Sequence, residues 1–287
     1  MKFSIILPSH NNLKYLKICL DSIKKNSIFE HDVNIHLNEG SDGSFEFLKK
    51  TGIKFSHSLE NLGLCKGTNR AASLAETEYY IYTHDDMYFL PRWDFFLNEE
   101  IKKVQNNLYY FSGTMMGPKG SGFVDLNCGA TADEFDEKKL LENYKNFNLF
   151  DHQGSHWAPH LIHKSIWDKI GGFSKEFDPG FASDTDLNMK LWKIGVRIFK
   201  GINNFKVYHF GSITLRKKKE VKKNHGNRYF LQKWGISSDL FIKFYLKSGT
   251  KYNGPLEDKP KINLAYIIEF IRCKSKFFLL KILFFKL

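Results

Sequence analysis

The sequence lacks several patterns that would place it in other classes of protein. Its four cysteines lie far apart with no C-x-x-C pair, and no secretory-type leader precedes the first strand-like segment. These two absences predict a reduced, cytoplasmic protein. No uninterrupted apolar run reaches the roughly 20 residues that span a bilayer. The turn after the first predicted strand, LPSHNNLKYL, contains no glycine, so the G-x-G-x-x-G turn of a nucleotide-dependent oxidoreductase is absent.

The sequence is rich in apolar residues and positive charge. Hydrophobic residues make up 42% of the 287 positions, enough for the core of one large α/β unit with an appendage. The net charge of +12 indicates an anionic partner, which could be nucleic acid, an acidic membrane surface or a phosphorylated substrate. Charge alone does not choose among these partners. Salt-sensitive binding to DNA or RNA would indicate a nucleic-acid-binding protein.

Strand-like and helix-like segments alternate through the N-terminal third. A first apolar run stops at Pro8, and the spacing of the leucines that follow is typical of one face of a helix. Further strands are predicted over 32–37, 53–58 and 79–83, with helices between them. This alternation predicts a mainly parallel sheet with helices on both faces. Ligands of such sheets bind beyond the carboxyl ends of the strands, near the switch in strand order.

Polar residues follow three of the predicted strands. They are Ser9, the loop 38–44 and the step His84, Asp85, Asp86. Two adjacent carboxylates at the end of a strand can hold a divalent cation that neutralises phosphate oxygens. The alternative is a solvated turn, because aspartate is common after strands.

Six segments in order resemble family 2 glycosyltransferases of the glycosyltransferase-A fold, over about residues 2–212. They are FSIILPSHNNLKYLKICLDSI, NEGSDGS, ENLGLCKGTNRAA, HDDMYFLPRW, IGGFSKEFDPGFASDTDLNMKLWKIG and VYHFGS. The resemblance implies a Rossmann-like α/β fold and inverting transfer of a sugar from a nucleotide-sugar donor, assisted by a manganese or magnesium ion. The implied acceptor is a hydroxyl of a cell-surface glycan or of a lipid-linked molecule, and no nucleic acid partner is expected. The alternatives are a non-catalytic, nucleotide-sugar-binding homologue and a sugar-nucleotide pyrophosphorylase, although the glycine-rich phosphate loop of the latter is absent.

The resemblance assigns contacts with the donor to six polar residues: Ser9, Asn11, Asn38, Glu39, Asn69 and Asp85. Within this set, Glu39 would accept a hydrogen bond from the imino N–H of the nucleobase. Asp85 would contact the ribose, because His84 stands where the family usually has the first aspartate of its Asp-x-Asp motif.

The resemblance also implies a metal site and an acceptor pocket. Asp86 matches the metal-ligand position, and His209 matches a histidine that completes the metal shell. A hydrogen-bonded strand histidine is the alternative for His209. Trp157 would lie in the acceptor pocket, with its ring against a sugar, and core packing is the alternative.

Asp184 is the predicted catalytic base. Inverting transfer needs one carboxylate to take the proton of the acceptor hydroxyl. Leu187 and Leu191 predict a buried helical face for this segment, with Ser183 as the N-cap. The chain has Ser183 where the family usually has glutamate, and a purely structural role in the first turn of the helix is the alternative for Asp184.

The composition changes after residue 212, so we predict a catalytic domain over 1–212 and a basic, helical extension over 213–287. The block LRKKKEVKKNHGNRYF is either a solvated segment or a lid whose lysines or Arg216 meet the diphosphate. Residues 262–287 combine apolar runs with five basic residues and one acid, Glu269. This pattern is typical of an interfacial helix on an anionic membrane, here the inner face of the cell membrane. A homodimer contact or a helix that caps the core is the alternative.

Overall fold

The computed structural model describes residues 1–120, 122–147, 149–211 and 225–284. Its centre is one ten-stranded sheet with the strand order β3-β2-β1-β4-β9-β6-β10-β5, in which β7 pairs with β6 and β8 with β10. The strands are β1 (Ser4–His10), β2 (Asp32–Asn38), β3 (Lys54–Ser58), β4 (Tyr79–Tyr82), β5 (Met87–Phe89), β6 (Tyr109–Gly117), β7 (Val124–Asp125), β8 (His152–Gln153), β9 (His160–His163) and β10 (Ile198–His209).

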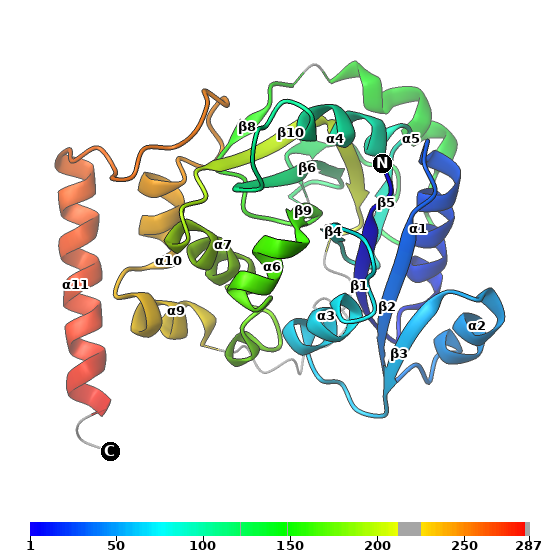
Figure 1. Cartoon of the computed structure of the whole chain (residues 1–287), viewed down its shortest axis with the longest axis horizontal. Coiled ribbons are helices and arrows are strands. Elements are labelled where there is room, and N and C mark those ends of the chain that lie inside the picture. The colour runs from blue at the N-terminus through cyan, green and yellow to red at the C-terminus, as the bar shows by residue number, and fades with distance from the viewer. Residues whose placement is uncertain (121, 148, 212–224, 285–287) are drawn as a thin grey trace.

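Helices connect and cover these strands (Figure 1). They are α1 (Leu13–Asn26), α2 (Ser44–Thr51), α3 (Leu64–Ala72), α4 (Trp93–Ile101), α5 (Glu137–Asn143), α6 (Lys164–Ile170), α7 (Ser183–Lys193), α9 (Gly226–Trp234), α10 (Ser238–Leu240) and α11 (Leu264–Phe284). Short helical turns lie at η1 (Tyr144–Asn146), η2 (Lys175–Phe177) and η3 (Phe241–Tyr245). In Figure 1, strands β1 and β2 lie between α3 on one side and α1 on the other. The predicted α/β architecture is confirmed.

The sheet is mixed but mostly parallel. Strands β3, β2, β1 and β4 are parallel neighbours, and β6 is parallel to β10. Strand β9 is antiparallel to both β4 and β6 and joins the two groups. Strand β9 was not predicted from the sequence.

Strand β1 continues through Pro8, where the apolar run stops. Residues Ser4 to Ile6 pair with β4, whereas Pro8 lies beyond the last of these pairs. Proline has no N–H to donate to a neighbouring strand, so its place past the β4 pairing removes no ladder hydrogen bond on that side. The strand therefore reaches His10 and carries Ser9 to the edge of the sheet.

Part of the predicted C-terminal extension packs into the main core. Phe230, Phe241, Leu246 and Leu256 are buried in the same hydrophobic cluster as the central strands. The predicted boundary at residue 212 and the proposed lid residue Arg216 lie outside the described residues, and both stay predictions. All four cysteines are buried free thiols. Among the described helices, none is both long enough and apolar enough to span a bilayer.

Candidate active site

The polar side chains predicted for the site gather at one edge of the sheet. Because β1, β2 and β4 are parallel neighbours, their carboxyl ends meet there. Ser9 and Asn38 lie at the ends of β1 and β2, and residues 83–86 follow β4. Strand β10 runs antiparallel to β5, and its last residue, His209, is opposite Met87. The fold therefore brings His209 beside Asp86.

Asp85 is a buried carboxylate whose hydrogen bonds join the segment 83–86 to the end of β1. The Ser9 hydroxyl donates to Asp85 Oδ2 at 2.6 Å, and Asn12 Nδ2 donates to Oδ1 at 2.9 Å. Burial, followed by the charge of Asp86, raises the pKa of Asp85 to about 7. Ser9 and Asp85 are thus hydrogen-bonded to each other, and their contacts with a nucleotide stay predictions. The role of Asn12 was not predicted from the sequence.

Glu39 is held by two neighbours at the predicted base site. Asn11 Nδ2 donates to Glu39 Oε2 at 2.8 Å, and His10 Nε2 lies 3.1 Å from Oε1. Asn11 and Glu39 both have positive φ angles, 46° and 59°. Non-glycine residues held in this conformation cost free energy and occur preferentially at functional sites. The geometry therefore favours Glu39 as a positioned acceptor, and its contact with a base stays a prediction.

Three other predicted contacts also make hydrogen bonds within the chain. The Asn38 side-chain carbonyl accepts from the Leu62 backbone N–H at 2.8 Å. The Asn69 amide both donates to and accepts from the backbone of Phe173, at 2.8 and 2.9 Å, which ties α3 to the segment before α7. Trp157 is half-buried, and its indole N–H donates to the Gly113 carbonyl at 2.9 Å. Their predicted substrate contacts stay predictions.

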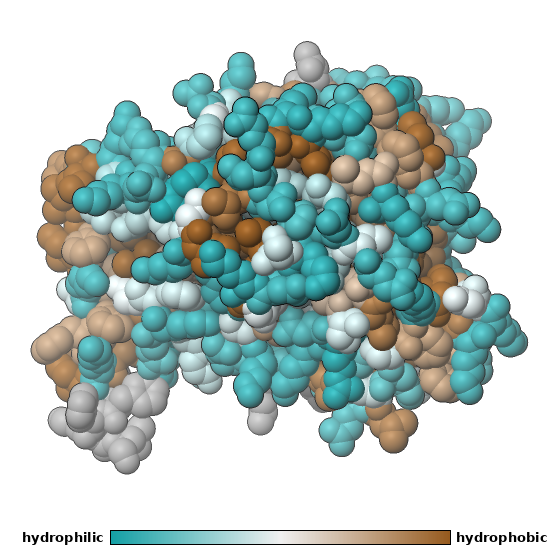
Figure 2. Space-filling view, viewed as in Figure 1, coloured by the Kyte–Doolittle hydropathy of each residue, from teal (hydrophilic) through white to brown (hydrophobic). Residues whose placement is uncertain are grey.

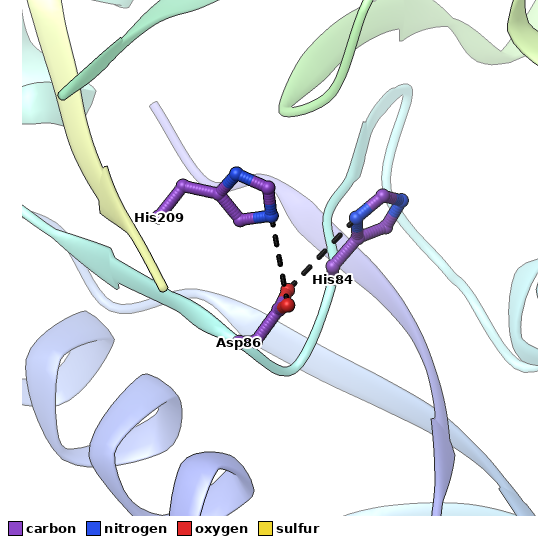
Figure 3. A group of neighbouring side chains, drawn as sticks. All are labelled: His84, Asp86 and His209. Carbon is purple, nitrogen blue, oxygen red and sulfur yellow. Dashed lines mark ion pairs between the residues drawn. The ribbon is translucent and has the colours of Figure 1, made fainter. Parts of the chain in front are cut away.

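His84, Asp86 and His209 form a group that could hold a metal ion. One donor atom from each lies within 4.8 Å of the other two. Figure 3 shows both imidazole rings turned toward the Asp86 carboxylate, with His209 Nε2 3.5 Å from Oδ2 and His84 Nδ1 4.0 Å from Oδ1. Burial lowers the pKa of His84 to about 4, so its imidazole is neutral at pH 7, the form that binds metals. Imidazole nitrogens and a carboxylate fit a divalent cation chemically.

Asp184 lies in the first turn of α7 and has an unused oxygen. Within the described residues, its Oδ1 is buried and has no hydrogen-bond partner. Burial raises its pKa to about 7. The Tyr82 hydroxyl lies 2.8 Å from His84 Nε2. Burial, followed by the charge of Asp184, raises the pKa of Tyr82.

Asp186 has a different role from Asp184, although both lie in the same turn. It accepts from the Ser174 hydroxyl at 2.6 Å and the Trp234 indole N–H at 2.8 Å, and it pairs with Lys233 at 2.9 Å. The predicted N-cap of this helix is wrong. The cap is Ala182, with φ 62°, and the Ser183 hydroxyl donates instead to the Gly180 carbonyl at 2.6 Å.

Comparisons with known proteins identify the family of the chain. Residues 4–158 match the family described as "Glycosyl transferase family 2". Hyaluronan synthase of Pasteurella multocida and chondroitin synthase of Pasteurella multocida (strain Pm70) are each 24% identical to this chain over 233 residues, or 77% of it. The chain spans 22% of the length of each of these relatives.

Solved structures share the fold at low sequence identity. S. aureus TarS 1-349 in complex with UDP-GlcNAc is similar with a TM-score of 0.58 and 16% identity, over 96% of this chain and 80% of that chain. GalNAc-T7 with UDP, GalNAc and Mn²⁺ is similar with a TM-score of 0.54 and 14% identity, over 73% and 44%. These likenesses confirm the predicted glycosyltransferase-A fold. The family match covers more than half of the sequence, and the chain belongs to glycosyl transferase family 2.

Proposed function

We propose that the chain transfers a sugar, with inversion, from a nucleotide-sugar donor to an acceptor hydroxyl, with a divalent cation at His84, Asp86 and His209. One observation carries the proposal: His84, Asp86 and His209 offer a donor set suited to a cation, and Asp184 has a buried oxygen without a hydrogen-bond partner among the described residues. A bound manganese or magnesium ion would supply Lewis-acid stabilisation of the diphosphate leaving group. The chain's residues hold the donor, orient the acceptor and accept its proton.

In the region proposed to bind the nucleotide, a carboxylate can accept a hydrogen bond from the nucleobase. Glu39 is fixed between His10 and Asn11, so a carboxylate oxygen can accept the imino N–H of a base such as uracil. The solved structures of S. aureus TarS contain UDP and UDP-GlcNAc, which supports a uridine donor for this chain.

Asp184 is the proposed general base. With its pKa raised to about 7, its carboxylate is a stronger base than an exposed aspartate and still ionises near neutral pH. Trp157, half-buried, is the proposed wall of the acceptor pocket. The two Pasteurella relatives are named as synthases of hyaluronan and chondroitin, which supports a glycan as the acceptor. We propose that this glycan lies on a cell surface or is linked to a lipid.

A thermal-shift panel tests the donor assignment. We expect one class of nucleotide sugar, with UDP-sugars first, to raise the melting temperature, and manganese to increase that shift, because a ligand bound only by the folded state stabilises it by mass action. UDP-, GDP-, dTDP- and CMP-sugars would be measured with manganese and with a chelator. If no member of the panel shifts the transition under either condition, the donor proposal is wrong.

The exposed face of helix α11 is the basis for proposing an anionic membrane surface as a further partner. One of its faces packs on α9 and α10 through Cys273 and neighbouring rings. The opposite face exposes apolar side chains to solvent, and Figure 2 shows hydrophobic residues at the edge of the molecule where α11 lies. They are Leu264, Ile267, Ile268, Ile271, Phe278, Leu279 and Ile282.

Basic residues border this exposed face on both sides. By helical spacing, Arg272 and Lys276 lie along one border, and Lys274 and Lys281 along the other. An apolar strip between rows of cations fits lipid acyl chains flanked by anionic headgroups. We therefore propose that the chain binds the inner face of the cell membrane through this strip. A second copy of the chain is the competing occupant.

Replacing Ile271 and Phe278 by glutamine should weaken binding to anionic liposomes by at least about tenfold. The two side chains are 58% and 65% exposed, and full burial of each in lipid is worth about 1.5–3 kcal/mol. Co-sedimentation with phosphatidylserine vesicles at low salt would measure the loss. Ile28→Gln is the matched control, because Ile28 is 51% exposed away from α11. Unchanged sedimentation, or conversion of a dimer to a monomer, would show that the strip is not a membrane surface.

A further inference from the structure

Five aromatic rings form a row in and around strand β8. In order along the row they are Phe150, His152, Phe123, Trp157 and His156. The centroids of neighbouring rings lie 5.1, 4.3, 4.4 and 5.1 Å apart, the spacing of packed aromatic pairs. Phe123 is 40% and Phe150 45% exposed, although phenyl side chains are usually buried. The row is therefore an aromatic surface that is partly open to solvent.

His152 lies within this row and has two unpaired ring nitrogens. It is buried, stacks on Phe123 at an interplanar angle of 25° and packs against Phe150. Burial lowers the pKa of His152, so its ring is neutral at pH 7 and offers one donor and one acceptor. Neither nitrogen has a hydrogen-bond partner among the described residues. Since buried polar groups are nearly always hydrogen-bonded, this side chain indicates a partner that the chain does not supply.

His156, at one end of the row, has a nitrogen available as an acceptor. Its Nδ1 lies 3.2 Å from the Gly154 carbonyl oxygen, and because a carbonyl only accepts, Nδ1 carries the proton. The Ser248 hydroxyl oxygen, also 3.2 Å from Nδ1, can accept from it as well. Burial lowers the pKa of His156, so the ring is neutral and Nε2 keeps a lone pair. Within the part of the chain that the structure describes, Nε2 makes no hydrogen bond.

Packed side chains connect Trp157 to the proposed site of transfer. The Tyr110 hydroxyl lies 3.1 Å from the Trp157 carbonyl oxygen and 2.9 Å from His160 Nδ1. The His160 and Tyr82 rings pack with centroids 5.0 Å apart, and the Tyr82 hydroxyl lies 2.8 Å from His84 Nε2. Three side chains thus separate Trp157 from His84. An acceptor that reaches from the site of transfer to the row must therefore be longer than one sugar residue.

We propose that this row is a carbohydrate-binding subsite, which holds further sugar residues of the acceptor glycan beyond the residue that is glycosylated. A pyranose ring has an apolar C–H face that can pack on an aromatic ring, and hydroxyl groups at its edge that donate and accept hydrogen bonds. Phe123 and Phe150 offer the first kind of contact. The unpaired nitrogens of His152 and His156 offer the second.

This combination favours a sugar over an apolar occupant. A lipid chain or an apolar peptide side chain would cover the phenyl rings but leave the imidazole nitrogens unpaired, which costs free energy. The inference rests on the proposed function and deepens it, because it makes the acceptor an oligosaccharide and names the side chains that bind its distal part.

Saturation-transfer NMR with the whole chain tests the subsite without donor, metal or turnover. The probes are cellohexaose, maltohexaose, chitohexaose and mannohexaose, and we expect at least one to bind. Phe123→Ala and Phe150→Ala should each weaken that binding by about 3–10-fold, through loss of one aromatic contact. Tyr229→Ala is the matched control, because Tyr229 is 40% exposed on α9, outside the row, and it should bind as the wild type does. Thermal melts would establish that the variants are folded.

Two results would overturn the subsite. One is the absence of binding by all four hexasaccharides, or equal affinities in the two phenylalanine variants and the wild type. The other is conversion of a dimer to a monomer by Phe150→Ala in gel filtration, which would make the row an interface between two copies of the chain.

His156→Asn tests the polar contact. An asparagine amide can still donate to the Gly154 carbonyl, but it lacks the acceptor that Nε2 provides. We expect it to weaken binding of the same hexasaccharide by about 3–10-fold, as loss of one hydrogen bond does. Unchanged affinity would show that His156 is not part of the subsite.

The panel of nucleotide sugars separates failure of this inference from failure of the proposed function. If nucleotide sugars raise the melting temperature but no hexasaccharide binds, only the subsite is wrong. If a hexasaccharide binds through Phe123 and Phe150 but no nucleotide sugar shifts the transition, the row binds carbohydrate and the proposed function is wrong.

Discussion

Asp184→Asn is expected to lower the rate of sugar transfer by roughly 10²–10⁴-fold while leaving donor affinity nearly unchanged. The substitution keeps the size of the side chain but removes its capacity to accept the proton of the acceptor hydroxyl. In the structure, Asp184 Oδ1 makes no hydrogen bond with the described residues, so little of the fold depends on it. Single-turnover transfer and separate donor titrations would measure the two effects.

The pH profile gives a second readout of the same variant. Burial raises the pKa of Asp184 to about 7, and only the deprotonated carboxylate can act as the base. Transfer by the wild type should therefore fall as the pH drops below about 7, and this acid limb should disappear in Asp184→Asn. A variant that keeps the acid limb would assign it to another group, such as Asp85, whose pKa is also raised to about 7.

Asp186→Asn is the matched control for Asp184→Asn. Its carboxylate binds Ser174, Lys233 and Trp234, so its loss should lower the melting temperature, with a smaller effect on transfer by the folded protein. If the two variants lose similar amounts of transfer activity, or if Asp184→Asn also loses donor binding, Asp184 has a structural or donor-binding role.

The sequence predicted the architecture and the edge that carries the site. Strand periods in the first 83 residues correspond to β1 to β4, and polar residues after them meet because parallel strands end at one edge. The pairing of Asp86 with His209 was implied by the resemblance, and the order of β5 and β10 explains it physically.

The hydrogen-bond partners within the site could not be predicted in the same way. Asn12 contacts Asp85, His10 contacts Glu39, and the neighbouring turn residues Asn11 and Glu39 both have positive φ angles. Neither residue is a glycine, and positive φ is uncommon for other residues even where asparagine favours it, so the sequence indicates that conformation only weakly.

Asp86→Ala should abolish the metal-dependent part of nucleotide-diphosphate binding. Asp86 lies between the two imidazoles, and its carboxylate is the negatively charged member of the group. Without it, only the imidazoles of His84 and His209 remain to hold a dication. Equilibrium dialysis of UDP with and without Mn²⁺ would measure the loss. The remaining affinity of Asp86→Ala for UDP should equal that of the wild type in a chelator.

The same substitution should lower the rate of transfer at least about a hundredfold, because a cation on the leaving diphosphate is worth several kcal/mol of transition-state stabilisation. A chelator should slow the wild type to the same level and have no further effect on Asp86→Ala, since both treatments remove one ion. Its melting temperature without metal should stay close to that of the wild type, which would exclude unfolding as the cause. Unchanged turnover in Asp86→Ala, or full wild-type activity in a chelator, would show that this group does not hold a cation required for transfer.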